Sequence, residues 1–548
     1  MCGRAERKIA RQQPYYASSC KRALRNTRRD RGTCFPVRST RRRRRRSGPR
    51  SRCRAMASTG VLLAHCTNKR GFDNDMKPEN RAGSRNTEAP REVQRTRGTK
   101  ATSGRANSRT ARVPPYRVVD LFCGAGGLSE GFRQAGFAII AGSDHDPDAM
   151  ATYARNFPEA SAITGDIRSL PIRERILEAA RSASVLIGGP PCQAFSQVRN
   201  HTRMIDDPRN ALYREFVGVL KQVLPPAFVV ENVTGMDQMG VREQIAKDLS
   251  LEGEYVVLPQ VVDAADFGVP QTRKRLLFIG VRASSGMAPP ELIGSDAAQA
   301  VTLARFTGSR RPRYQLVVQE HIRSMRTGEA LTDTEDASVV SAADAISDLV
   351  ELPVGNRCDV MEYSELPGPR SAYQRLMREG AGDVLANVQV PRINPDTRLR
   401  LLGIPPGGNY RDLREELQER YITGHRWGQD NGTGKLSRKH FYAYRRLHPD
   451  VWAWTLNTKA DSVYHYSVAR ALSVREFARL QSFPDRFVFT TDPTPGMIEG
   501  RHDGGPAHSR YRQVGNAVPP LLAKAVASSL LQQLRLRENE DGRYVKAG

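Results

Sequence analysis

The sequence lacks the long apolar runs and paired cysteines that mark several classes of protein. No stretch approaches the roughly 20 apolar residues that a membrane-spanning helix needs. The longest apolar run near the N-terminus, residues 61–64, is too short for a signal peptide. Eight cysteines among 548 residues, none in a Cys-x-x-Cys pair, exclude a disulfide scaffold and give no zinc-binding spacing. We therefore expect a protein of a reducing compartment, with no membrane segment and no metal site.

Positive charge is plentiful, but it is concentrated at one end. The chain has 85 Lys and Arg against 58 Asp and Glu, a net charge of +27. Residues 1–116 hold 32 basic and 7 acidic residues, whereas the other 432 hold 53 and 51. Residues 1–114 are poor in large apolar side chains, so the sequence predicts a disordered basic tail. The arginine run at 41–46 indicates a nucleic-acid or localisation patch, or else a solvated tail read from an upstream start, with Met56 and Met76 as later starts.

Strands and helices alternate from residue 116 onward. This pattern predicts an α/β fold, in which a parallel sheet is covered by helices and binds ligands at the carboxyl ends of its strands. Residues 285–450 lack the alternation and read as an inserted region of mixed structure, with a charged helical piece at 411–420. Order returns with helices at 473–481 and 520–534. The predicted strands are 117–122, 138–143, 161–164, 184–187, 227–230, 255–262 and 276–281, and the predicted helices between them are 128–135, 148–156, 173–181 and 213–223.

A glycine-rich segment follows the first predicted strand. In residues 120–127 (DLFCGAGG) the glycines allow a tight turn close to a ligand, and the next helix offers free N–H groups. Asp144 and Asp166, at later strand ends, could accept hydrogen bonds from ribose hydroxyls and an adenine amino group. The three strand ends outline a nucleoside-type pocket; the alternative is an ordinary turn with solvated aspartates.

Three further segments carry side chains suited to catalysis. Cys192 lies in a proline-stiffened loop, GGPPCQAFS (188–196), which favours a nucleophilic thiolate over a buried cysteine. Glu231 ends an apolar strand, where partial desolvation favours a proton donor near neutrality, although such a residue can also cap the next turn. Arg273 and Arg275 point the same way in an extended segment and could clamp a phosphate or a base oxygen, or form a solvated basic edge.

These segments, in this order, resemble the DNA cytosine-C5 methyltransferase family. The resemblance covers residues 117–282 and about 440–534. The gap of about 190 residues between two of its segments is where that family carries a variable target-recognition domain. The matching segments are DLFCGAGGLSEGF (120–132), GDI (165–167), GGPPCQAFS (188–196), ENV (231–233), QTRKR (271–275), LSVREFARLQSFPD (472–485) and QVGNAVPP (513–520).

The resemblance implies a fold, a reaction and a set of site residues. The fold is a Rossmann-like S-adenosylmethionine-dependent methyltransferase sheet, divided into a catalytic domain (115–284), a target-recognition region (285–465) and a return to the catalytic domain (466–548). The base flips out of the duplex, Cys192 adds to C6 and the methyl group is transferred to C5. The implied catalytic residues are Cys192, Glu231, Arg273 and Arg275; the cofactor-binding residues are Phe122, Gly124, Gly126, Asp144, His145, Asp166, Ile167 and Asn516; the substrate-binding residues are Gln193, Ser196, Asn232, Gln271 and Thr455.

One departure and two alternatives stay open at this point. Family members often have Glu and then Trp where this chain has Asp144 and His145, so stacking on adenine falls to a smaller ring. An RNA (tRNA) cytosine-C5 methyltransferase is one alternative, although its target insert is smaller. A non-enzymatic nucleic-acid-binding protein driven by the arginine tail is the other. We expect a monomeric bacterial enzyme in the cytoplasm, associated with the nucleoid through double-stranded DNA. It is either the partner of a cognate restriction endonuclease in a restriction-modification system or a solitary methyltransferase.

Overall fold

The computed structural model describes residues 116–191, 211–234, 241–295, 340–421, 435–436, 443–491 and 505–546. All of them belong to one compact unit of the chain, Asn80–Gly548. The predicted disordered tail, 1–114, lies outside the described residues.

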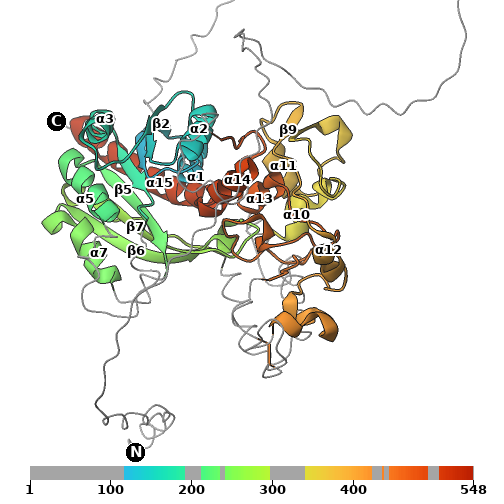
Figure 1. The fold of residues 1–548 in the computed structure, drawn as a ribbon. Helices are drawn as coiled ribbons and strands as arrows, with labels where there is room; N and C mark the ends of the chain where they lie inside the picture. The colour runs from blue at the N-terminus through green and yellow to red at the C-terminus, as the bar shows by residue number, and fades with distance from the viewer. Residues whose placement is uncertain are drawn as a thin grey trace, which may run out of the picture. The chain divides into compact units, whose positions relative to one another are not determined.

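A seven-stranded sheet forms the centre of the described part of the chain (Figure 1). Its strand order is β3-β2-β1-β4-β5-β7-β6, and the first five strands in this order are parallel. β7 pairs antiparallel with both β5 and β6, so the predicted parallel sheet has an antiparallel edge. The strands are β1 (Arg117–Leu121), β2 (Ala138–Asp144), β3 (Ser161–Thr164), β4 (Val185–Gly188), β5 (Ala227–Val233), β6 (Tyr255–Asp263) and β7 (Lys274–Arg282).

Helices cover both faces of the sheet because successive strand residues point to opposite sides. Val118 and Val229 belong to one buried cluster and their neighbours Val119 and Phe228 to the other. The first cluster takes side chains from α1, α2, α13, α14 and α15, and the second takes them from α3, α5 and α7. These helices are α1 (Gly127–Gln134), α2 (Pro147–Asn156), α3 (Leu170–Ala180), α5 (Ala211–Val223), α7 (Arg242–Leu249), α13 (Val474–Leu480), α14 (Gly505–Asn516) and α15 (Pro520–Lys546).

The described part of the inserted region consists of short elements. Some surround two small apolar clusters, whereas Ile346, Tyr373 and Met377 belong to the large cluster that contains Val118. The predicted helix at 411–420 is wrong, because three separate 3₁₀ turns occupy this stretch: Tyr410–Asp412, Glu415–Leu417 and Glu419–Tyr421. Tyr410, Leu413 and Tyr421 share one buried cluster with other tyrosines, and their spacing of three and eight residues also fits one face of a helix, so the pattern alone does not distinguish the two structures. The other elements are α10 (Ala342–Ile346), β8 (Val360–Glu362), α11 (Ala372–Arg378), β9 (Val384–Ala386) and α12 (Pro395–Leu402).

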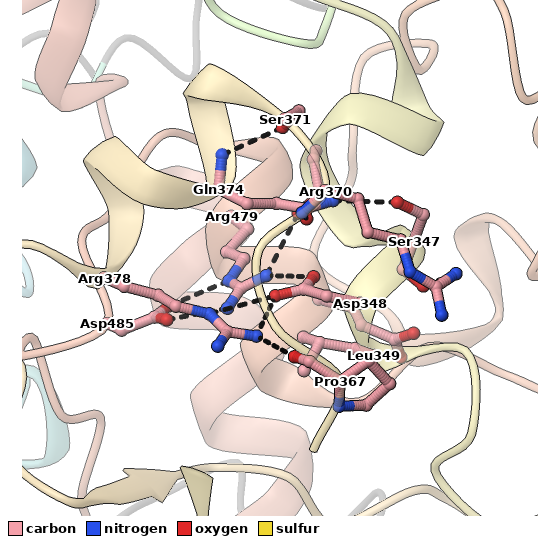
Figure 2. Close-up of polar contacts among 12 residues, drawn as sticks. Ser347, Asp348, Leu349, Pro367, Arg370, Ser371, Gln374, Arg378, Arg479 and Asp485 are labelled. Carbon is pink, nitrogen blue, oxygen red and sulfur yellow. Dashed lines mark hydrogen bonds and ion pairs between the residues drawn. The ribbon is translucent and has the colours of Figure 1, made fainter.

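A buried polar network joins this region to α13 (Figure 2). The fully buried Arg479 donates to Asp348 Oδ1 at 2.6 Å and to both carboxylate oxygens of Asp485 at 2.9 and 2.7 Å. Arg378 also contacts Asp348, and the side chain of Gln374 bonds to Ser347 Oγ at 2.9 Å. Because each buried charge has a partner, the network fixes α13 against residues 341–378.

One helical stretch, Ser509–Arg537, is long and apolar enough to cross a membrane by length and composition alone. Within the protein, 61% of its most apolar window is buried. Leu522, Val526 and Leu530 of α15 belong to the apolar cluster that contains Phe132 of α1. The stretch is thus a core helix of the described fold.

Candidate active site

A cavity of about 430 Å³ opens at the carboxyl ends of β1, β4 and β5, and we call it the central cavity. This is the edge at which α/β sheets bind ligands. The cavity is also bounded by the start of β7 and by the turn between α14 and α15. Its lining includes Asp120, residues 122–125, Asp144, His145, residues 189–191, residues 231–233, Arg273, Arg275 and Asn516.

The glycine-rich turn holds its shape through left-handed backbone conformations and one carboxylate. Phe122, Gly124 and Gly126 have φ of 59°, 53° and 97°, and for a bulky residue such as Phe122 this conformation is strained. Asp144 Oδ2 accepts from the backbone N–H of Gly124 at 2.9 Å, which ties the turn to β2. Gly126 does not line the cavity; a Cβ there would lie 2.4 Å from the ring of Phe157, so the glycine permits close packing.

A second cavity of about 220 Å³, the side cavity, shares Phe122, Asp144 and His145 with the first. Asp166 and Ile167 complete its lining together with Ser143, Gly165, Arg168 and Leu212. The Arg168 guanidinium lowers the pKa of Asp166, and the hydrogen bond that His145 donates to the Asp144 carboxylate raises the pKa of His145. Phe122 and Ile167 offer apolar surface to a base, and the two carboxylates offer acceptors for its sugar and amino groups.

Asp120 also lines the central cavity, although the family resemblance does not name it among the site residues. It is fully buried, its Oδ2 accepts from the Ser129 hydroxyl at 2.7 Å, and its Oδ1 has no hydrogen-bond partner among the described residues. Burial, with Asp144 nearby, raises its pKa to about 7. An acidic residue within the apolar run RVVDLF was the signal in the sequence. A carboxylate lining the central cavity suits a cation, and S-adenosylmethionine carries both a sulfonium and an ammonium group.

The two cavities therefore fit S-adenosylmethionine, with a nucleoside on the side of Phe122, Asp144 and Asp166 and the charged end toward Asp120. Cys123, the other cysteine near this turn, is buried, and burial raises the pKa of its thiol well above the ordinary value. It packs against Met150, with the two sulfur atoms 3.5 Å apart. Among the residues that the structure describes, no cluster could hold a metal ion.

Glu231 and Arg275 form an ion pair in the wall of the central cavity. Glu231 Oε1 lies 2.5 Å from Arg275 Nε, and the two side chains are 13% and 11% exposed. The pairing follows from the register of the two strands. Arg275 of β7 lies opposite Val233 of β5, and Glu231, two residues before Val233, points to the same face of the sheet. A Cβ at Gly189 would lie 3.1 Å from Glu231 Oε2, so the glycine makes room for the carboxylate.

Asn232 connects the Glu231 strand to the loop that leads to the cysteine. Its amide donates to the carbonyl oxygen of Pro190 at 3.1 Å, and its Oδ1 accepts from the backbone N–H of Val233. This contact holds the described end of the proline-stiffened loop beside Glu231. Cys192, Gln193 and Ser196 lie outside the described residues.

The two arginines do not act alike, although the extended pattern predicts that they point the same way. Both line the central cavity, but only Arg275 contacts Glu231. Arg273 is 3% exposed and donates to the carbonyl oxygens of Leu456 at 3.2 Å and Gly515 at 2.7 Å. Burial lowers the pKa of its guanidinium. Arg273 therefore stabilises the wall of the central cavity through its hydrogen bonds, whereas Arg275 places its positive charge in the cavity beside Glu231.

Two predicted substrate-binding residues lie away from the central cavity. Gln271 is fully buried, and its side chain bonds to Gln481, Leu480 and Leu456. Thr455 donates its hydroxyl to the carbonyl oxygen of Thr272 at 2.7 Å. The Gln271 amide is used inside the protein, whereas Thr455 is exposed and bonded to the Thr272 backbone. Of the predicted substrate-binding residues that the structure describes, Asn232 lines the central cavity.

The comparisons with known proteins agree with this geometry. The model of the C-5 cytosine-specific DNA methylase family matches residues 116–532. The Type II methyltransferase M.AgeI of Thalassovita gelatinovora is 31% identical over 474 residues, covering 76% of this chain and 99% of that protein. The Type II methyltransferase M.DdeI of Desulfomicrobium norvegicum is 32% identical over 427 residues, covering 75% and 88%.

A crystal structure from E. coli, described as a DNA modification methyltransferase encoded within a prophage, has the same fold. It has a TM-score of 0.52 and 24% identity, and the match covers 77% of this chain and 99% of that one. These findings favour a DNA methyltransferase over the RNA-directed and non-enzymatic alternatives. The chain belongs to the C-5 cytosine-specific DNA methylase family, whose members are S-adenosylmethionine-dependent enzymes.

Proposed function

We propose that the protein methylates C5 of a cytosine flipped out of a specific DNA sequence, and that the reaction takes place in the central cavity. Cys192 is the nucleophile, and Glu231 and Arg275 act beside it on the flipped base. The observation that carries the proposal is the Glu231–Arg275 pair, which lies in the same cavity as the glycine-rich turn and Pro191, the residue before Cys192. The contact between Asn232 and Pro190 supports it, because it holds the cysteine loop at this cavity.

The chemistry assigns one role to each of these groups. The Cys192 thiolate forms a bond from Sγ to C6 of cytosine, and Glu231 donates a proton at N3, so that C5 gains the electron density it needs. S-adenosylmethionine would supply an electrophilic methyl group to C5 and leave as S-adenosylhomocysteine. Loss of the C5 proton to solvent, return of the N3 proton to Glu231 and release of the Cys192 thiolate then restore the aromatic ring and free the enzyme. Arg275 holds the Glu231 carboxyl and contacts the flipped nucleotide, and Arg273 supports the cavity wall through its bond to the Gly515 carbonyl oxygen.

The cofactor is held by residues of both cavities. Phe122, His145 and Ile167 take the adenine, Asp144 takes the ribose hydroxyls and Asp166 the adenine amino group. Gly124 and Asn516 flank the methionine end, where Asp120 offers a carboxylate to positive charge. Gly126 acts indirectly, because it lets the turn pack against Phe157.

We further propose that residues 285–465 read the DNA sequence, that residues 115–284 and 466–548 form the catalytic domain, and that the enzyme is a monomer. Named relatives of bacterial origin are type II methyltransferases, which supports a role beside a restriction endonuclease. The same relatives support action on double-stranded DNA in the bacterial cytoplasm, at the nucleoid. Gln193, Ser196 and Thr455 are proposed to lie near the flipped base once DNA is bound.

Bisulfite sequencing of host DNA tests the proposed function. The full chain is expressed in a bacterial host without cytosine methylation, beside a Cys192→Ser variant as the matched control. We expect protected cytosines at one short recurring sequence with the full chain and none with Cys192→Ser. Full conversion of all cytosines in both strains, with soluble protein present, would refute the proposal.

A further inference from the structure

Two fully buried glutamines meet next to the segment that carries Arg273 and Arg275. The side-chain Nε2 of Gln271 donates to Oε1 of Gln481 at 2.6 Å and to the carbonyl oxygen of Leu480 at 3.2 Å. Gln271 lies two residues before Arg273, and Gln481 directly follows α13. We call these two residues the amide pair. A buried amide keeps a fixed orientation because each of its polar atoms needs a partner.

On one side, the amide pair is tied to Arg273. Gln271 Oε1 accepts from the backbone N–H of Leu456 at 2.9 Å, while Arg273 donates to the carbonyl oxygen of the same residue at 3.2 Å. Both backbone polar groups of Leu456 therefore have a partner, because its N–H donates to Gln271 and its carbonyl oxygen accepts from Arg273. Any rotation of the Gln271 amide moves the acceptor on which the Arg273 guanidinium rests.

On the other side, the amide pair is tied to the turn between α14 and α15. Gln481 Nε2 donates to the carbonyl oxygens of Val514 at 2.8 Å and Ala517 at 3.2 Å. Between these two residues lie Gly515, whose carbonyl oxygen accepts from Arg273 at 2.7 Å, and Asn516, which lines the central cavity. A Cβ at Gly515 would lie 2.2 Å from the carbonyl oxygen of Asn457. The backbone at Gly515 therefore packs directly against Asn457, the residue after Leu456, to which Gln271 bonds.

The amide pair has a rigid base. Arg479, two residues before Gln481, is locked between Asp348 and Asp485 (Figure 2), and Tyr373 donates to its backbone carbonyl at 2.6 Å. Gln481 thus has a fixed position relative to the inserted region. A continuous series of contacts therefore leads from Asp348 through α13 to the amide pair, and from the amide pair to Arg273 and Asn516 in the wall of the central cavity.

We propose that Gln271 and Gln481 are positioning residues that hold Arg273 and the Asn516 turn at the spacing the central cavity needs. The proposal rests on the proposed function for the site, and neither glutamine touches the substrate. Positioning errors of about 1 Å can lower a rate about 100-fold even when the altered residue lies away from the chemistry. The loss of the amide pair should therefore affect methyl transfer and cofactor affinity together.

The test compares Gln481→Leu with Gln374→Leu in the full chain. Gln374 is an equally buried glutamine in the same network, with its side chain bonded to Ala343, Ser347 and Arg370 and with no described contact to the cavity (Figure 2). It is therefore matched to Gln481 in burial and hydrogen bonding. Single-turnover methyl transfer at saturating DNA is measured per folded enzyme, and S-adenosylhomocysteine affinity is measured by calorimetry.

We expect Gln481→Leu to lower the single-turnover rate about 10- to 100-fold and to weaken S-adenosylhomocysteine binding several-fold. Gln374→Leu should change both by less than about twofold while lowering the unfolding temperature to a similar extent. Equal rates and equal affinities in the two variants would overturn the positioning role. If the wild-type chain methylates no DNA, the proposed function fails, but the calorimetric comparison of the two variants still tests the amide pair.

A conservative variant separates the two sides of the pair and serves where Gln481→Leu does not fold. Gln481→Glu keeps an oxygen that can accept from Gln271 but loses the N–H groups that reach Val514 and Ala517. We expect it to bind S-adenosylhomocysteine more weakly than the wild type, with partial recovery at lower pH, where a protonated carboxyl regains one donor. Wild-type affinity at every pH would contradict the proposal.

Discussion

Protonation of His465 should destabilise the fold in weakly acidic solution. Its side chain is fully buried, and Nδ1 accepts from the backbone N–H groups of Ser467 at 3.1 Å and Val468 at 3.4 Å. A proton on Nδ1 would remove both bonds. Nε2 has no hydrogen-bond partner among the described residues and lies 3.7 Å from Glu476 Oε1.

Burial and the neighbouring charges together set the pKa of His465, and this pKa gives the size of the destabilisation. Burial lowers its pKa from 6.5 to about 4; Glu476 acts to raise the pKa, whereas Arg470 and Arg446 lower it. Because the unfolded chain takes up the proton first, the stabilisation is complete above pH 6.5 and is lost as the pH falls toward 4. A shift of this size corresponds to about 3 kcal/mol below pH 4 and to about 1.4 kcal/mol between pH 8 and pH 5.5.

Urea unfolding at pH 8 and pH 5.5 measures this contribution. His465→Asn is the comparison, because an amide oxygen can still accept a hydrogen bond but the side chain does not titrate. The wild type should lose about 1.4 kcal/mol more than His465→Asn over this interval, since other titrating groups are common to both. Parallel losses in the two proteins would refute the assignment of a neutral, buried histidine.

Three further substitutions test the network, the catalytic wall and the cofactor cavity. Arg479→Met should cost about 3 to 5 kcal/mol in urea unfolding because it removes one partner from each of two buried carboxylates, Asp348 and Asp485, whereas the exposed Arg414→Met should change stability little; similar costs would contradict the network. Gly189→Ala should displace Glu231 and lower the single-turnover rate about tenfold with an unchanged unfolding curve, and a wild-type rate would count against it. His145→Trp should tighten S-adenosylhomocysteine binding in calorimetry by adding aromatic area to a side chain that is 75% exposed; weaker binding would exclude stacking at this position.

Local patterns in the sequence predicted the sheet and the glycine-rich turn well. Short apolar runs followed by aspartate, glycine or glutamate correspond to β2, β4 and β5, and Glu231 lies at the cavity edge as the strand pattern predicts. The antiparallel β7 and the 3₁₀ turns at 410–421 depend on packing between distant segments, which periodicity does not report.

The roles of several polar side chains could not be predicted for the same reason. Arg273 bonds to carbonyl groups 183 and 242 residues away, so its extended neighbours give no hint of its direction. Arg475 and Arg479 lie on a helix whose pattern suggests a solvated charged face, yet both are fully buried with Asp485. Only the tertiary structure identifies these charges as structural.

The measurement that tests the central claim most directly is covalent trapping on DNA that contains 5-fluorocytosine. The full chain is incubated with this DNA and S-adenosylmethionine, and the denatured product is digested and mapped. Fluorine at C5 cannot leave as a proton, so release of the thiolate is blocked and a stable adduct should accumulate at Cys192. No adduct should form with Cys192→Ser. Methylation of ordinary cytosine without any adduct, or an adduct at Cys123, would contradict the account.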